Sequence, residues 1–401
     1  MFKSNLLSHS SCNTNIATVY LIILCIQFSS MPFIMGSSIE KFILMALAPL
    51  IFIIKTPYLS KAFLWGGLYW LICYFCASFQ DYLRFSTLGF LGMYILTYIM
   101  YYNLVHSNTF SLLFFMNLIK GLIIAFGVVL ILQQIAMLIG IHTFWPINLY
   151  NQPFLSLTKL PSLTMEPSHS ARILTVAMLA YIRCIELENN NIKPSIKELF
   201  APKNRWVTIL FLWSMLTMGS GTAFIGLGLL SLYFLTLRNS YYVIPILIVT
   251  FLIANSLGLK QMNRATLVTE ASMTGNVNDV RETDGSAASR IVPLINTFTK
   301  TDLTDATTWL GHGTDSKEYA SKSWMRTTDK LGVIDQYGLI AFIISLIFAY
   351  TCMIRHFFSL ESLIFLFLFG WSLSNIYYTW GAMMILTAIR YFQVEQENEL
   401  L

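Results

Sequence analysis

The sequence predicts an all-α membrane protein that crosses the bilayer many times, and three observations lead to that fold class. Hydrophobic residues make up 56% of the 401 residues and charged residues only 11%, whereas soluble domains carry roughly 25% charged residues. Apolar stretches near the ~20 residues needed to span a bilayer recur along most of the chain. The charged residues concentrate instead in one late segment. We therefore expect a polytopic helical bundle with one extramembrane domain.

About twelve apolar stretches are predicted as transmembrane helices, with boundaries uncertain by several residues. They cover residues 16–35, 39–54, 61–79, 86–105, 112–140, 169–186, 206–219, 221–238, 241–259, 332–354, 359–374 and 376–391. The predicted organisation is a membrane bundle over 1–259 with a cytoplasmic loop at 187–205, an outer loop domain at 260–331, and C-terminal spans with a cytoplasmic tail over 332–401.

The segment 260–330 has the composition of a soluble domain. Its 71 residues hold nine Lys/Arg and nine Asp/Glu, which is 18 of the 45 charged residues of the chain. Its formal charge is therefore zero, and a neutral domain gives no reason to expect nucleic-acid binding.

Positive residues in the short loops predict the orientation, because cytoplasmic loops are enriched in Lys and Arg. One cytoplasmic cluster lies between the sixth and seventh spans and consists of Arg183, Lys193, Lys197, Lys203 and Arg205. Counting outward from it, short connections on the opposite side hold only Lys41, Arg84, Lys159 and Arg172. Both termini are then cytoplasmic, and 141–168 and 260–330 face outward.

The opening of the sixth span carries the first candidate site. Pro167 suits the first turn of a helix, where its missing N–H is not needed. Glu166, His169 and Arg172 follow at spacings of three, which places them on one side of that helix. An arginine about 8 Å inside the membrane needs water, an anion or a carboxylate. Arg172 either faces a substrate or turns outward and pairs with Glu166.

The outer segment carries the second set of candidates. A histidine between two glycines can present an exposed imidazole that acts as a base near neutral pH, and arginine binds phosphate oxygens bidentately. The candidates are His312 between Gly311 and Gly313, and the arginines Arg264, Arg281 and Arg290.

Several other patterns are interpreted conservatively. The turn Gly219-Ser220-Gly221 precedes a helix and is either a backbone anion site or a plain interhelical turn. Cys73 and Cys76 lie in an apolar stretch and are interpreted as apolar residues rather than a redox or metal pair. No repeat relates the two halves, which disfavours a transporter. No metal or nucleotide motif is present, so we expect no metal and no cofactor.

Three segments together resemble the O-antigen polymerase and ligase superfamily of bacterial inner-membrane proteins, and within it the Wzy-type polymerases. The first is Glu166-Pro167-Ser168 before a span. The second is Arg290 followed some twenty residues later by Gly311-His312-Gly313. The third is Tyr337-Gly338-Leu339-Ile340 at the next span. The likeness covers about 160–380.

The resemblance implies a GT-C-like membrane glycosyltransferase with its active site facing the periplasm. Its substrates would be oligosaccharide repeat units linked through pyrophosphate to undecaprenyl lipid, and a chain-length regulator is a candidate partner. The growing glycan would be transferred to an incoming lipid-linked repeat unit. Glu166, His169 or His312 would accept a proton. Arg172 and Arg290, with Arg281 and Arg264, would bind the pyrophosphate.

Two alternatives stay open. Ligases of the superfamily, which join glycan to lipid A core, carry a histidine after the Gly-x-Gly, and residues 319–326 contain none. The sequence therefore favours polymerase over ligase. A flippase or transporter would need charged residues at mid-membrane depth and symmetric halves, and neither is clear here.

Overall fold

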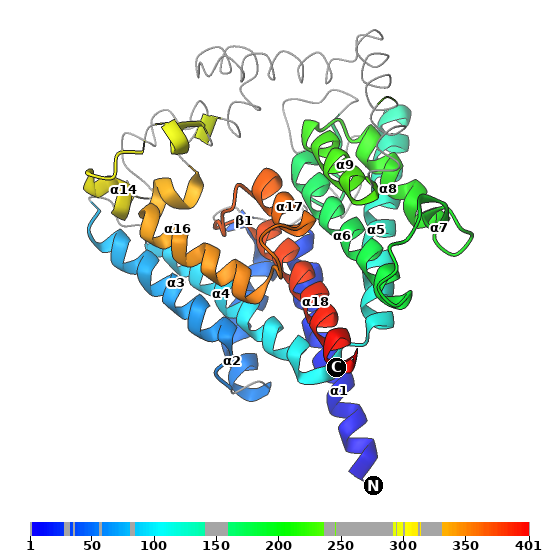
Figure 1. The fold of residues 1–401 in the computed structure, drawn as a ribbon, viewed down its shortest axis with the longest axis horizontal. Coiled ribbons are helices and arrows are strands. Elements are labelled where there is room, and N and C mark those ends of the chain that lie inside the picture. Colours follow the sequence, from blue (N-terminus) through cyan, green and yellow to red (C-terminus); the bar gives the residue numbers. More distant parts are fainter. Residues whose placement is uncertain are drawn as a thin grey trace.

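In the computed structural model, helices make up most of the chain that the structure describes (Figure 1). The described residues are 2–27, 33–34, 37–55, 58–80, 85–140, 159–235, 245, 292–293, 295–299, 301–311, 313 and 331–400. The predicted span 241–259, apart from residue 245, lies outside them, as do most of the outer segment and Arg264, Arg281, Arg290 and His312.

The N-terminal half contains α1 (Phe2–Cys25), a two-residue hairpin of β1 (Phe33–Ile34) and β2 (Ser37–Ser38), α2 (Ile39–Lys55), α3 (Lys61–Ser78), α4 (Phe85–Leu104) with the π-helical turn η1 (Val105–Thr109), and α5 (Leu112–Ile139). The rest contains α6 (Pro167–Glu188), α7 (Ile196–Leu199), α8 (Arg205–Thr217), α9 (Gly221–Phe234), α14 (Ala306–Leu310), α16 (Gly332–Cys352), α17 (Leu360–Phe369) and α18 (Tyr377–Leu400).

Every predicted span other than 241–259 coincides with a helix. The largest boundary difference is in the first one, since α1 ends at Cys25 and β1 already lies at 33–34. Serine side chains mark several of the helix starts: Ser60, Ser111 and Ser359 each accept a hydrogen bond from the third residue of the following helix. Gly140 ends α5 in a left-handed conformation.

Three described helices are long and apolar enough to cross a membrane, namely Phe85–Ser107, Leu112–Ile139 and Gly332–Cys352. Helix α5 also exposes large apolar side chains on its outer face, including Leu138, which is 80% exposed. An apolar face of this kind suits lipid rather than water. The described chain is thus an α-helical membrane protein.

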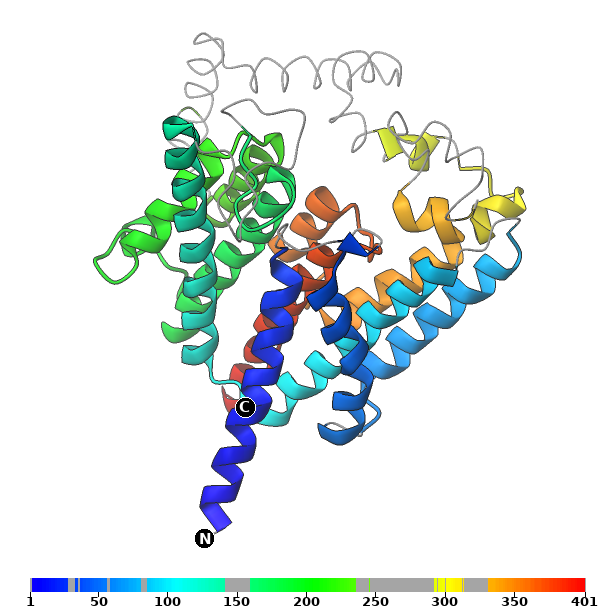
Figure 2. The same cartoon turned by 180° about the vertical axis from the view of Figure 1, so that it is seen from behind.

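The helices form two groups with α1 and α18 between them (Figures 1 and 2). On one side α16 packs on α3, and α2 and α3 pack on α4. On the other side α5, α8 and α9 surround α6. Helix α18 contacts α6, α1 and α4, and its Trp380 is fully buried. It therefore joins the two groups.

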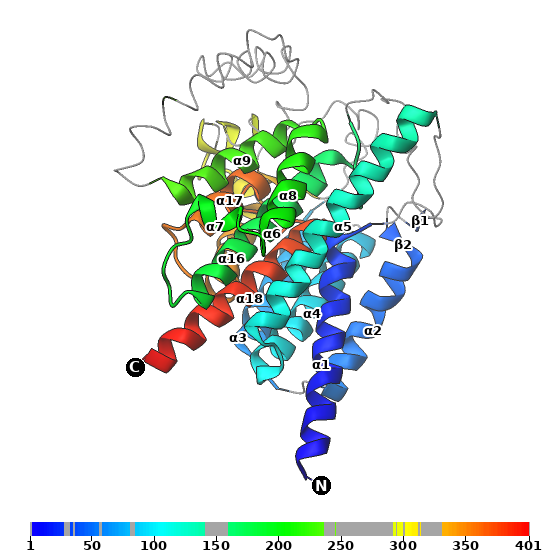
Figure 3. The ribbon, with the colours of Figure 1, turned by 90° about the vertical axis from the view of Figure 1, so that its right-hand side faces the viewer.

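Helices α6 and α18 run in the same direction. Their first turns meet through Arg172 and Tyr378, and near their other ends Gln396 donates to the carbonyl of Leu187 at 3.3 Å. The two chain termini lie at this second end (Figures 1 and 3). Arg172, predicted for the outer side of a membrane, and the two chain termini, predicted for the cytoplasmic side, thus lie at opposite ends of the bundle.

Candidate functional site

The site begins where the chain enters α6. Glu166 has extended backbone angles (φ −136°, ψ 145°) and is the N-cap residue, and Pro167 occupies the first helical position. This is the start that the sequence predicts, because a proline there sacrifices no helical hydrogen bond. Helix α6 is buried along most of its length, so its first turns are held in a fixed place.

The segment before α6 is fixed by hydrogen bonds from α5. The side chain of Gln133, which is 2% exposed, donates to the Ser162 carbonyl at 3.0 Å and accepts from the Ser162 N–H at 2.8 Å. Ser162 has a positive φ of 54° and its hydroxyl donates to the Phe126 carbonyl at 2.6 Å. A buried amide that satisfies both backbone groups of one residue fixes the path of the loop.

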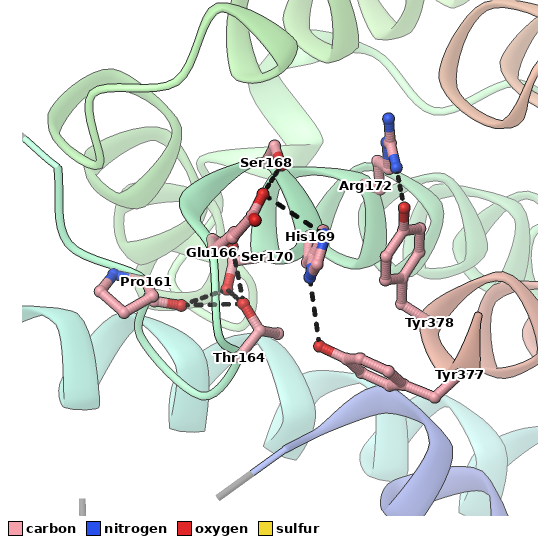
Figure 4. Close-up of polar contacts among 9 residues, drawn as sticks. All are labelled: Pro161, Thr164, Glu166, Ser168, His169, Ser170, Arg172, Tyr377 and Tyr378. Carbon is pink, nitrogen blue, oxygen red and sulfur yellow. Dashed lines mark hydrogen bonds and ion pairs between the residues drawn. The ribbon is translucent and has the colours of Figure 1, made fainter. Parts of the chain in front are cut away.

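Two hydroxyls connect this segment to the helix itself (Figure 4). The hydroxyls of Thr164 and Ser170 lie 2.8 Å apart, and Thr164 also donates to the Glu166 carbonyl at 2.8 Å. Ser170 in turn donates to the Pro161 carbonyl. These buried contacts position Glu166 at the N-terminus of α6.

Glu166 and His169 form a pair on the exposed side of the first turn. Nε2 of His169 lies 3.6 Å from Oε2 of Glu166, and the Ser168 hydroxyl donates to the same oxygen at 3.2 Å. The Glu166 side chain is 53% exposed and that of His169 is 19% exposed. A carboxylate beside an imidazole provides a proton acceptor that is open to a ligand.

Arg172, one turn further on, contacts a tyrosine instead of Glu166. One terminal nitrogen donates to the Tyr378 hydroxyl, and the guanidinium carbon lies 5.0 Å from the centroid of the Tyr378 ring. Among the residues that the structure describes, no carboxylate pairs with Arg172, and its buried Nε has no hydrogen-bond acceptor. The alternative in which Arg172 pairs with Glu166 is therefore wrong.

Two neighbouring tyrosines of α18 close the site, as Figure 4 shows. The Tyr377 hydroxyl lies 3.4 Å from Nδ1 of His169. The Tyr378 ring lies 4.2 Å from the His169 ring, centroid to centroid, and so contacts both His169 and Arg172. The structure thus brings Glu166, His169 and Arg172 together and adds a phenol beside the base and another beside the cation.

Neither tyrosine is predicted from the sequence. They lie more than 200 residues after Arg172, and no local spacing connects them with α6. The one available signal was a pair of tyrosines at the start of an apolar stretch, where amphipathic rings are common at a membrane interface.

The two glycine motifs on either side of residues 314–330 meet in space. Gly311 (φ 79°, ψ 172°) and Gly338 (φ 81°, ψ 179°) both adopt angles that only glycine tolerates. A Cβ on Gly338 would lie 2.1 Å from the Trp309 carbonyl oxygen. The Gln80 side chain donates to the carbonyls of Leu310 and Gln336, each at 2.8 Å. The backbones of the two motifs therefore touch, and Gln80, which follows the end of α3, holds them together.

The remaining candidates lie elsewhere. Gly219 has a left-handed φ of 72°, and Ser220, the N-cap of α9, makes no side-chain capping bond, which fits a plain turn. The Cys73 and Cys76 thiols are free and buried. In the described part of the chain, no three His, Cys, Asp or Glu residues lie close enough together to hold a metal ion.

A second charged cluster lies at the opposite end of the bundle. Arg183 donates to Glu361 at 2.8 Å and to Glu186 at 2.7 Å, linking α6 to α17. Beside it is a cavity of about 230 Å³ that Arg355 and Glu397 also line. All of these arginines belong to the side predicted to be cytoplasmic.

Comparisons of the chain with protein-family models, with characterised proteins and with solved structures found no match. The function is therefore argued from the site.

Proposed function

We propose that the protein is a membrane glycosyltransferase that polymerises oligosaccharide repeat units linked to undecaprenyl pyrophosphate. The observation that carries the proposal is Arg172. Its guanidinium contacts the hydroxyl and the ring of a single tyrosine, Tyr378, and no carboxylate among the described residues neutralises it. An uncompensated arginine near a membrane interface indicates an anionic ligand.

The reaction has a simple atom balance. A hydroxyl oxygen of the acceptor sugar attacks the anomeric carbon of the donor glycan, and the bond from that carbon to the pyrophosphate oxygen breaks. The electron pair leaves with the pyrophosphate, and the hydroxyl proton passes to a base. The required parts are thus a cation where negative charge accumulates and a base near the acceptor.

Arg172 fits the first part. A guanidinium can grip two phosphate oxygens at once, and its Nε has no acceptor within the described chain. Tyr378 holds the guanidinium in place, since its hydroxyl accepts a hydrogen bond and its ring centroid lies 5.0 Å from the guanidinium carbon. Preorganised donors of this kind stabilise developing charge without reorganising.

Glu166 and His169 fit the second part. Glu166 is the more exposed of the two and is held 3.6 Å from His169. The Tyr378 ring contacts both His169 and the guanidinium of Arg172, so base and cation are neighbours in one site. A reaction between a sugar hydroxyl and a diphosphate ester requires a base and a cation to lie close together in one site.

The finer architecture belongs to the same proposal. We propose about twelve spans in a GT-C-like bundle in the bacterial inner membrane, with the site facing the periplasm, where a flipped lipid-linked sugar is presented. The proposal is supported by helices that coincide with the predicted spans and by the separation of Arg172 from the basic cluster at the other end. Arg290, Arg281, Arg264 and His312 would complete the site from the outer segment.

A deletion of the gene in the native strain tests the proposal. Surface polysaccharide resolved on a gel should lose its long chains and keep a single repeat unit attached to the core, and the wild-type gene should restore the ladder. Core with no repeat unit would indicate a ligase or a flippase instead. Transport of lipid-linked oligosaccharide into vesicles by the purified protein would then identify the flippase.

A further inference from the structure

A buried lysine of α2 lies behind the candidate site. The sequence pattern places Lys41 in a short outer connection, but the structure places it in the first turn of α2 with only 2% of its surface exposed. Its Nζ donates to the Ile26 carbonyl at 2.9 Å and lies 3.7 Å from the centroid of the Tyr377 ring. Within the described chain, no carboxylate forms an ion pair with it.

A buried ammonium is costly unless polar groups compensate it. The Ile26 carbonyl follows the last turn of α1, where helix carbonyls lack helical partners and favour a cation. The face of Tyr377 supplies a cation–π contact. These contacts explain how the buried amine is held. An apolar side chain would fill the same space without the cost of burying a polar group, so a lysine at this position needs a reason other than packing.

That reason lies at the hydroxyl of Tyr377. The Tyr377 hydroxyl lies 3.4 Å from Nδ1 of His169, and Nε2 of His169 lies 3.6 Å from Glu166. Lys41, Tyr377, His169 and Glu166 therefore form a chain of direct contacts that runs from α2 through α18 to α6. Fixing the Tyr377 ring fixes the hydroxyl that orients the imidazole.

The same ammonium also ties the surrounding segments together. It holds the end of α1, where the N–H of Gln27 donates to the Leu163 carbonyl of the segment before α6 at 2.8 Å. Tyr377 is in edge contact with Tyr378, the partner of Arg172, with ring centroids 5.4 Å apart. The Lys41 amine thus contacts α1 and α18 directly and is linked to the segment before α6 through Gln27.

We propose that Lys41 is a positioning residue that acts through Tyr377 to orient His169, the partner of Glu166 in the proposed base. The inference rests on the proposed function and adds a residue that the spacing of the sequence does not reveal. Lys41 is buried and its contacts are with Ile26 and Tyr377, so it acts on the site indirectly.

Kinetics of the purified full-length protein with a lipid-linked repeat unit provide the first test. Lys41→Met keeps the length of the side chain and removes the charge, and should lower kcat about tenfold with little change in KM, because orientation acts on the chemical step. Lys41→Arg should restore most of kcat. The control is Lys120→Met, which removes another helical lysine, 5.5 Å from the Tyr181 ring and outside this site.

A double variant separates positioning from a general effect on the fold. If Lys41 acts through Tyr377, Lys41→Met combined with Tyr377→Phe should be no slower than Tyr377→Phe alone. Multiplicative losses would overturn the proposal. A variant that fails to accumulate in the membrane is replaced by Lys41→Gln, which keeps a donor to Ile26.

A chemical readout separates failure of this proposal from failure of the proposed function. The rate at which diethyl pyrocarbonate modifies His169, measured by mass spectrometry, should rise in Lys41→Met and stay unchanged in Lys120→Met. If the wild type polymerises nothing but this rate rises, only the proposed function fails. If the rate and kcat both match those of the wild type, Lys41 has no positioning role.

Discussion

Replacing Gly338 by alanine tests the junction between the two glycine motifs. Gly338 lies inside α16 with φ 81° and ψ 179°, where a side chain costs about 1–3 kcal/mol from backbone strain alone. Its Cβ would also lie 2.1 Å from the Trp309 carbonyl oxygen, a backbone atom that cannot rotate away. Helices α14 and α16 would have to separate.

Separation would also weaken the clamp formed by Gln80. Its amide donates to Leu310 on one side of the junction and to Gln336 on the other, and a typical hydrogen bond contributes about 0.5–1.5 kcal/mol. With the backbone strain, the expected loss is roughly 2–6 kcal/mol. For a chain of this length 1 kcal/mol moves Tm by roughly 1 °C, so Tm should fall by about 2–6 °C.

Thermal unfolding of the purified protein in detergent measures this loss. The matched control is Gly332→Ala in the first turn of the same helix, where the nearest atom to a new Cβ is the Ser372 hydroxyl at 3.7 Å. The control should unfold at the wild-type temperature. Equal Tm values for the two variants would refute the backbone contact between the motifs.

Two further substitutions test the contacts at either end of α6. Tyr378→Phe keeps the ring beside Arg172 but removes the hydroxyl that accepts the hydrogen bond from the guanidinium. Polymerisation should slow by about tenfold or more, which is the equivalent of a hydrogen bond to a charged group, and Tm should stay unchanged. Wild-type turnover would contradict this role of Tyr378. Arg183→Met leaves the buried carboxylates of Glu186 and Glu361 without their cation and should destabilise the protein by about 3–5 kcal/mol. Adding Glu361→Gln to the same chain should recover part of that loss. An unchanged Tm in Arg183→Met would show that these ion pairs do not stabilise the protein.

Much of the helical framework was predictable because membrane helices follow local rules. Runs of apolar residues give the spans, serine caps and glycine ends give the boundaries, and Pro167 marks the start of α6. These signals depend only on residues close together in the sequence. The end of α1 was placed too late, since the apolar run continues beyond Cys25 into the hairpin β1–β2.

The site was predictable only where it is local. Glu166 and His169 are three residues apart and contact each other, as helical spacing requires. The partner of Arg172 was not predictable, because Tyr378 belongs to a helix 206 residues away in sequence. Lys41 illustrates the same limit, since its burial depends on the meeting of α1, α2 and α18.

The glycine motifs were predictable in part: the residues were indicated by the sequence, but the contact between them was not. The sequence indicates Gly311 and Gly338 through a resemblance, and nothing in their spacing predicts that their backbones touch. The positive φ angles and the contact with Trp309 supply the physical reason for glycine at both positions. His312 and Arg290 lie outside the described residues, so their place in the site stays a prediction.

The central claim is that the Arg172 guanidinium stabilises a pyrophosphate leaving group, and complementation of the deletion strain tests it most directly. Arg172→Ala should give only single repeat units on the polysaccharide gel while the protein remains in the membrane. The control is Arg205→Ala, which removes an arginine at the start of a different helix, 5.4 Å from the Trp206 ring, and should give the full ladder. Wild-type chain lengths from Arg172→Ala would contradict the account.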